Sequence, residues 1–104
     1  MPNKEQTIDH GYYIWRKNIV ARDGGVCQFP KCTSSKDIEV HHIFRYSDNP
    51  SLRTNEDNGI SLCKIHHKYI TGQEEYFAFI FLEIVKAKKK QNEDYSGHKR
   101  TETT

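Results

Sequence analysis

Histidine side chains provide most of this chain's capacity for chemistry. Two adjacent residues, His41 and His42, end a short apolar run, and a second pair, His66 and His67, lies further along the chain. Imidazole acts as a general base near neutral pH and is the commonest metal ligand. Asn58 lies between the pairs, so the order from His42 to His67 is histidine, asparagine, histidine. These residue types suit acid–base chemistry beside a divalent ion.

The three cysteines have the spacing of a structural metal site. Four residues separate Cys27 from Cys32, in a loop whose backbone amides can point at sulfur, and two residues separate Cys63 from His66. A structural zinc ion needs four nitrogen or sulfur ligands at the corners of a tetrahedron, which two short pairs supply. Three unrelated buried thiols are the alternative, since free cysteine packs as a small hydrophobic residue. The two pairs favour zinc on Cys27, Cys32, Cys63 and His66.

His67 is predicted to serve a different site from its neighbour His66. Adjacent helical residues point about 100° apart, so two such imidazoles cannot easily bind one ion. The two-residue gap after Cys63 places His66 in the zinc pair. His67 is then directed toward a second metal.

The composition is that of one small, polar domain. The chain has 104 residues, 35% of them hydrophobic, and domains of this size often depend on a disulfide or a metal. Three cysteines and the absence of an apolar signal segment in residues 1–10 favour reduced thiols and a cytoplasmic location. No apolar run approaches the roughly 18 residues of a membrane span, so no membrane partner is expected.

Basic residues cluster although the net charge is only +2. The basic positions are Arg16, Lys17, Arg45, Arg53, Lys64, Lys68, Lys86 and Lys88 to Lys90. This distribution suits an anionic partner such as a nucleic acid, and it is equally typical of a solvated face.

Two strands and three helices are predicted to position the candidate residues. Alternation and β-branching indicate one strand over 38–43 and another over 59–62. Apolar residues at helical spacing indicate a helix that ends at the Asp23-Gly24-Gly25 turn, and further helices over 64–70 and 73–90. We expect a flexible arm over 1–10, one domain over 11–90 and a disordered tail over 91–104.

The combined motif resembles that of the HNH endonucleases. It consists of Val40-His41-His42-Ile43, Asp57-Asn58-Gly59-Ile60 and Leu62-Cys63-x2-His66-His67. The resemblance covers about residues 15–72 and includes Trp15-Arg16-Lys17 and the first cysteine pair, as in the small zinc-bearing HNH proteins of phages and homing elements. It implies an α+β fold with a ββα-metal (His-Me finger) core, a structural zinc knuckle, and flanking N- and C-terminal helices.

The resemblance implies a metal-dependent endonuclease that nicks or cleaves DNA by hydrolysing phosphodiester bonds. His42 corresponds to the general base, and Asn58 to the asparagine that braces the loop orienting that base. His41 and His67 correspond to the ligands of one catalytic divalent ion, which we expect to be Mn²⁺, Ni²⁺, Co²⁺ or Mg²⁺. Neighbouring strand residues point to opposite faces, so His41 and His42 address one phosphate only if the strand end twists.

Arg45 and Arg53, in the loop between the base and the asparagine, could hold flanking phosphates of the DNA. Ordinary exposed arginines are an equally good interpretation of both residues.

Two further functions are consistent with the sequence. A zinc-knuckle module could bind nucleic acid without cutting it, although it would not require His42, Asn58 and His67. A phage DNA-packaging accessory factor could act beside a terminase in the bacterial host cell, with the aromatic helix segment Tyr76 to Leu82 as the contact. The oligomeric state stays open.

Overall fold

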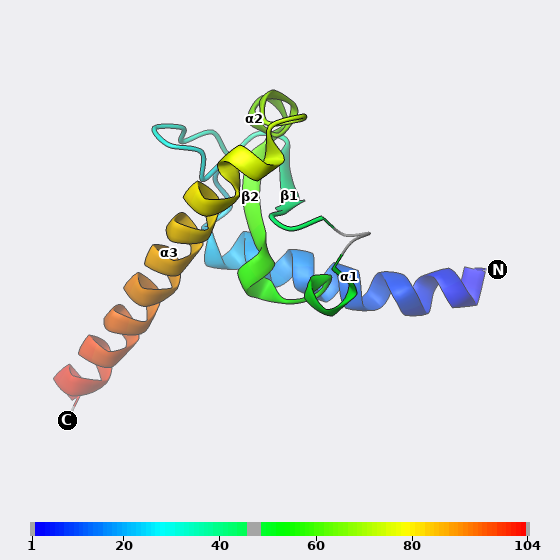
Figure 1. Cartoon of the computed structure of the whole chain (residues 1–104). Coiled ribbons are helices and arrows are strands. Elements are labelled where there is room, and N and C mark those ends of the chain that lie inside the picture. Colours follow the sequence, from blue (N-terminus) through cyan, green and yellow to red (C-terminus); the bar gives the residue numbers. More distant parts are fainter. Residues whose placement is uncertain (1, 46–48, 104) are drawn as a thin grey trace.

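Two antiparallel strands lie between three helices in the computed structural model, which describes residues 2–45 and 49–103 (Figure 1). The elements are α1 (Pro2–Arg22), β1 (Ile38–His42), β2 (Gly59–Cys63), α2 (Lys64–Tyr69) and α3 (Glu74–Thr103), with short 3-10 turns at η1 (Pro50–Leu52) and η2 (Glu56–Asn58). The expected α+β class is confirmed, and both predicted strands form within one residue of their predicted bounds.

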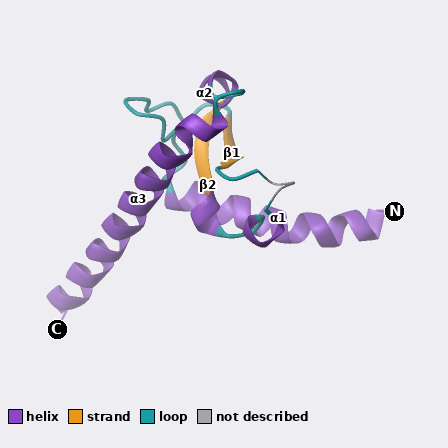
Figure 2. Ribbon diagram, in the orientation of Figure 1, coloured by secondary structure: helices purple, strands orange, loops and turns teal. Residues whose placement is uncertain are grey.

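The register of the two strands sorts their side chains onto two faces. His41 pairs with Ile60 and His42 pairs with Gly59. Because side chains alternate along a strand, His41 and Ile60 share one face while His42 and Gly59 share the other. Figure 2 shows the strands passing between α1 and α3, which cover opposite sides.

The core consists of two clusters, one on each face. On one side α1 contributes Trp15 and Ile19, which pack against Val40. On the other side Ile60 and Leu62 belong to a larger cluster with residues of α3, namely Phe77, Ala78, Phe81 and Val85. The apolar residues at helical spacing over 73–90 are thus mostly buried as predicted. Ile80 is the exception among them, because it is 37% exposed.

Gly59 allows α1 to approach the sheet closely. A Cβ at this position would lie 2.2 Å from Ile19 Cδ1 and 2.7 Å from Trp15 Cζ2. Any side chain here would displace α1, so the glycine after Asn58 has a packing role.

A buried ion pair ties the end of α1 to β2. Asp23 is 1% exposed, and its Oδ2 accepts a hydrogen bond from the Ser61 amide at 2.9 Å. Arg22 donates to both Asp23 oxygens and to the carbonyl of Gly59. The predicted helix end is confirmed, because the two glycines that follow have φ values of 70° and 74°.

The outer helices are longer than expected. Helix α1 begins at Pro2, and α3 continues past residue 90 to Thr103, so both project beyond the sheet (Figure 1). A helix started by packed turns extends at one hydrogen bond per added residue. The division into arm, domain and tail stays a prediction. None of the helices in the described ranges combines the length and apolar character needed to cross a membrane.

Candidate metal centre and histidine site

The four predicted zinc ligands lie together. The ligand atoms of Cys27, Cys32, Cys63 and His66 are all within 4.8 Å of one another. His66 Nδ1 is 3.3 Å from Cys63 Sγ and 3.7 Å from Cys27 Sγ. Tetrahedral zinc bonds of about 2.3 Å to sulfur and 2.0 Å to nitrogen separate these atoms by about 3.5 Å. The group therefore fits a structural metal ion such as zinc.

Local backbone structure explains why the thiols converge. The Cys32 amide bonds the Phe29 carbonyl at 2.9 Å, which closes the loop between the first two cysteines. The Phe29 amide points at Cys27 Sγ, 3.4 Å away, as predicted for this loop. Cys63 ends β2 and is the N-cap of α2, which places it one helical turn before His66. Burial raises the pKa of Cys27 to about 11, so metal binding to this thiol must displace a proton.

Phe29 connects the candidate metal centre to the core. Its ring stacks on the His66 imidazole, with centroids 4.1 Å apart and planes 2° from parallel. It also contacts Phe77 of α3 with centroids 5.7 Å apart. Loss of the metal would therefore loosen packing on α3 as well as the loop.

His41 and His67 meet on the face of the sheet away from α1. Their ring centroids are 5.3 Å apart, and His41 is 8% exposed. The buried His41 Nε2 has no hydrogen-bond partner in the described part of the chain. Burial, followed by the charge of His67, lowers the pKa of His41 to about 4. His41 is therefore neutral near pH 7, the state in which imidazole binds metals.

Glu39 orients His67, a contact that the motif alone does not reveal. Its Oε1 lies 2.5 Å from His67 Nδ1. A carboxylate accepts, so Nδ1 carries the proton and Nε2 is left as a possible metal ligand. Strand alternation could have suggested this residue, because Glu39 lies on the same face as His41. The unpartnered His41 Nε2 and the oriented His67 therefore lie side by side on one face of the sheet.

His42 lies on the opposite face, against α1. Its Nε2 is 2.9 Å from the carbonyl oxygen of Arg53, and its ring stacks on Trp15. A carbonyl only accepts, so Nε2 carries the proton and Nδ1 is the acceptor in the neutral ring. In that tautomer Nδ1 is the basic nitrogen of the ring.

Asn58 braces the loop that orients His42. It is 3% exposed, and its Oδ1 accepts from the Phe44 amide at 2.8 Å. Its Nδ2 donates to the carbonyls of Phe44 and Leu52 at 3.1 and 3.2 Å. These bonds fasten Phe44 and Leu52 to Asn58, and Leu52 directly precedes Arg53, whose carbonyl contacts His42. Both Nδ2 hydrogens and the Oδ1 atom of Asn58 are engaged with backbone groups, which is the pattern of a bracing residue.

The structure separates the roles of the two predicted phosphate contacts. Arg53 is half-buried and contributes its backbone oxygen to His42, whereas Arg45 is exposed. The charges of His41 and Arg45 both lower the pKa of Glu74, after the larger effect of the Glu74 backbone amide. His41 and Arg45 therefore both lie near the Glu74 carboxylate.

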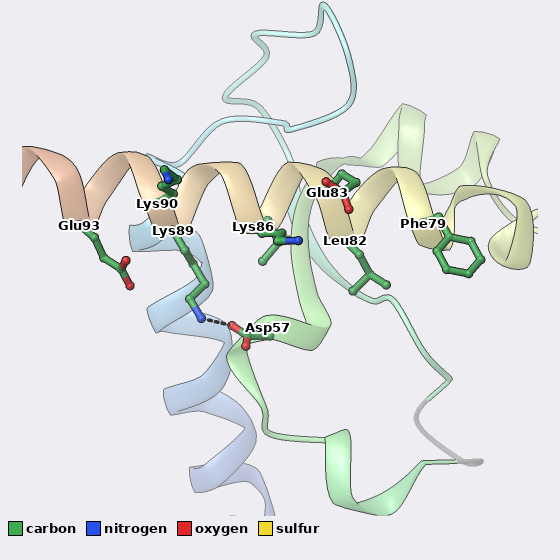
Figure 3. A pocket seen from close by; sticks show the side chains of 9 residues that line it. Asp57, Phe79, Leu82, Glu83, Lys86, Lys89, Lys90 and Glu93 are labelled. Carbon is green, nitrogen blue, oxygen red and sulfur yellow. Dashed lines mark hydrogen bonds and ion pairs between the residues drawn. The ribbon is translucent and has the colours of Figure 1, made fainter.

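A groove along α3 is distinct from both sites. Its lining includes Phe79, Leu82 and Lys86, and Lys89 Nζ pairs with Asp57 Oδ1 at 2.8 Å across it (Figure 3). Its lining contains no histidine or cysteine.

Comparisons of the chain with protein-family models, curated proteins and solved structures found no match. The geometry of the two sites and the histidine–asparagine–histidine motif are therefore the features that bear on function.

Proposed function

We propose that this protein is a metal-dependent endonuclease of the HNH type, which hydrolyses phosphodiester bonds of DNA on a ββα-metal core formed by β1, β2 and α2. The observation that carries the proposal is the unpartnered, buried Nε2 of His41 beside His67. A histidine that only fills a core normally has its nitrogens hydrogen-bonded. An orphaned imidazole nitrogen next to a second imidazole suits a bound cation.

The protein's own residues would activate the water. His42 presents Nδ1 as the base because Nε2 is held by the Arg53 carbonyl. A positioned base contributes roughly 10²–10⁴-fold to the rate, provided its pKa is near the working pH. Asn58 holds the loop that carries this carbonyl, and Glu39 sets the orientation of His67.

A divalent ion on His41 and His67 would supply charge neutralisation at the phosphate and at the leaving oxygen. Both ligands would be imidazole nitrogens, which favour Mn²⁺, Co²⁺ and Ni²⁺ over the harder Mg²⁺. The Cys27, Cys32, Cys63 and His66 group would hold zinc for stability and take no part in the chemistry.

The scissile phosphate would lie across the end of β1, since His41 and His42 leave that strand on opposite faces. Arg45, which like His41 lies near the Glu74 carboxylate, could contact an adjacent phosphate. A twist that brings both imidazoles to one face is then unnecessary. In this arrangement the ion on His41 and the base His42 act from opposite sides of β1.

The test is plasmid cleavage by the zinc-loaded protein with Mg²⁺, Mn²⁺, Co²⁺ or Ni²⁺. His42→Ala should lose cleavage by about 10²–10⁴-fold while DNA binding and zinc content are retained. The exposed His10 provides a matched control, because His10→Ala removes an imidazole away from the site. A His42→Ala protein that cuts as well as the parent would refute the assignment.

A packaging accessory role with a terminase in the bacterial host is the second candidate. Tyr76 and Phe79 on α3 are 71% and 77% exposed, which favours contact with another protein. Co-purification with a large phage partner, lost in Phe79→Ser, would support this role. DNA binding without cleavage under any metal would instead support the non-cutting zinc-knuckle module.

A further inference from the structure

We propose that Trp15 is a positioning residue, which holds the His42 imidazole in one orientation and one tautomer. It contacts both the imidazole ring and the loop whose Arg53 carbonyl accepts a hydrogen bond from that ring. This inference rests on the proposed function of His42 as the base. Trp15 is the chain's one tryptophan and is 2% exposed.

The indole restrains the plane of the imidazole. The centroids of Trp15 and His42 are 4.0 Å apart, and their planes are 14° from parallel. Tilting the His42 ring about its Cβ–Cγ bond would drive it into the indole face. Tyr12 flanks this pair, with its ring 5.5 Å from Trp15 and 6.3 Å from His42. The ring of His42 thus has one permitted plane.

Stacking alone does not select the tautomer, because a half-turn of the imidazole preserves its plane. The half-turn would exchange Nε2 with a carbon and break the bond to the Arg53 carbonyl. Trp15 also helps to hold this acceptor, since its Nε1 donates to the carbonyl of Asn55 at 2.8 Å. The Asn55 amide in turn bonds the Leu52 carbonyl at 3.3 Å, which closes a turn around Arg53.

One side chain therefore sets both restraints on the base. The indole face sets the plane of the His42 ring, and the indole N–H fixes the turn that presents the Arg53 oxygen. Asn58 secures the same turn from its other side through Leu52. Gly59 makes the arrangement possible, because a Cβ there would lie 2.7 Å from the Trp15 ring.

The experiment compares Trp15→Leu and Trp15→Phe in the full-length, zinc-loaded protein. NMR chemical shifts of the His42 ring nitrogens report the tautomer at one pH, and plasmid cleavage reports kcat and KM. Trp15→Leu removes both contacts, so we expect mixed tautomers and a fall in kcat of about 10–100-fold with KM unchanged. Trp15→Phe keeps a flat ring but no N–H donor. Its tautomer mixing and its fall in kcat should therefore both be smaller than those of Trp15→Leu.

Ile19→Ala is the matched control for lost packing. Ile19 is 0% exposed in the same cluster as Trp15, and its aliphatic side chain offers neither a ring to stack on His42 nor an N–H donor. Its substitution should lower the melting temperature and leave the His42 tautomer unchanged.

The outcomes separate this inference from the proposed function. A single His42 tautomer with parental kcat in Trp15→Leu would overturn it, as would equal tautomer mixing in Ile19→Ala. If Trp15→Leu does not fold, the other two variants decide the question. A single His42 tautomer in both Trp15→Phe and Gly59→Ala would also overturn the inference. If Trp15→Leu shows mixed tautomers but the parent protein fails to cut DNA with each of the metals tested, the restraint on His42 is supported and only the nuclease function is rejected.

Discussion

The Nδ1 atom of His67 and the Oε1 atom of Glu39 lie 2.5 Å apart and join α2 to β1 beside His41. The contact leaves Nε2 of His67 as the nitrogen available to an ion. Both side chains are partly exposed, at 34% and 43%, so water competes for the pair and its value is in orientation more than in stability.

Glu39→Ala should weaken binding of the catalytic divalent ion about 10–100-fold, the usual effect of removing a residue that orients a ligating histidine. Zinc content should not change, because the cysteine group is separate. Titration calorimetry with Mn²⁺ or Ni²⁺ on the zinc-loaded protein measures the effect. The exposed Glu83 on α3 serves as the control, as Glu83→Ala should bind like the parent. Equal affinities for all three proteins would contradict the role of Glu39.

Cys32→Ser should prevent folding rather than give a folded, inactive protein. In small zinc modules the binding free energy, on the order of 10 kcal/mol, is also folding free energy. Circular dichroism and zinc analysis of the purified protein test this expectation. Removal of zinc from the parent with a chelator should have the same effect. A folded, active Cys32→Ser protein without zinc would rule out a structural metal.

His41→Asp should shift the metal preference of cleavage toward Mg²⁺. The change replaces a neutral nitrogen ligand by a charged oxygen ligand, which the harder ion prefers. The parent should cut faster with Mn²⁺, Co²⁺ or Ni²⁺ than with Mg²⁺ at equal concentration. Cleavage rates of both proteins against each metal measure the shift. An unchanged ranking would remove His41 from the catalytic metal site.

Asp23→Ala should destabilise the protein by on the order of 3–5 kcal/mol, because it leaves the charge of the Arg22 guanidinium, itself 10% exposed, without its carboxylate partner. It also removes the acceptor for the Ser61 amide. Urea denaturation of the zinc-loaded protein measures the free energy of unfolding. The exposed pair of Lys89 and Asp57 is the comparison (Figure 3), and Lys89→Ala should change this free energy by no more than about 1 kcal/mol. Similar losses in both variants would show that burial of Asp23 contributes little.

Patterns between near neighbours in the chain predicted much of the candidate site. Alternation along the first strand predicted that His41 and His42 lie on opposite faces, as they do. The zinc ligands followed from two short spacings, because a tight loop and a helix N-terminus have little freedom in where they place side chains. The start of α1 and the end of α3 did not follow, since solvent-exposed turns carry no apolar periodicity to mark where a helix begins or stops.

The sequence by itself determined the α+β class, the two strands and the two ligand pairs, because each depends on residues close together in the chain. Only the tertiary structure decided how the two histidines of β1 are restrained. The stacking of Trp15 on His42 and the bond from Glu39 to His67 each join segments far apart in the chain. Such contacts depend on how α1 and α2 pack on the sheet, and this packing is set by shape at positions such as Gly59, where the absence of a side chain lets α1 approach.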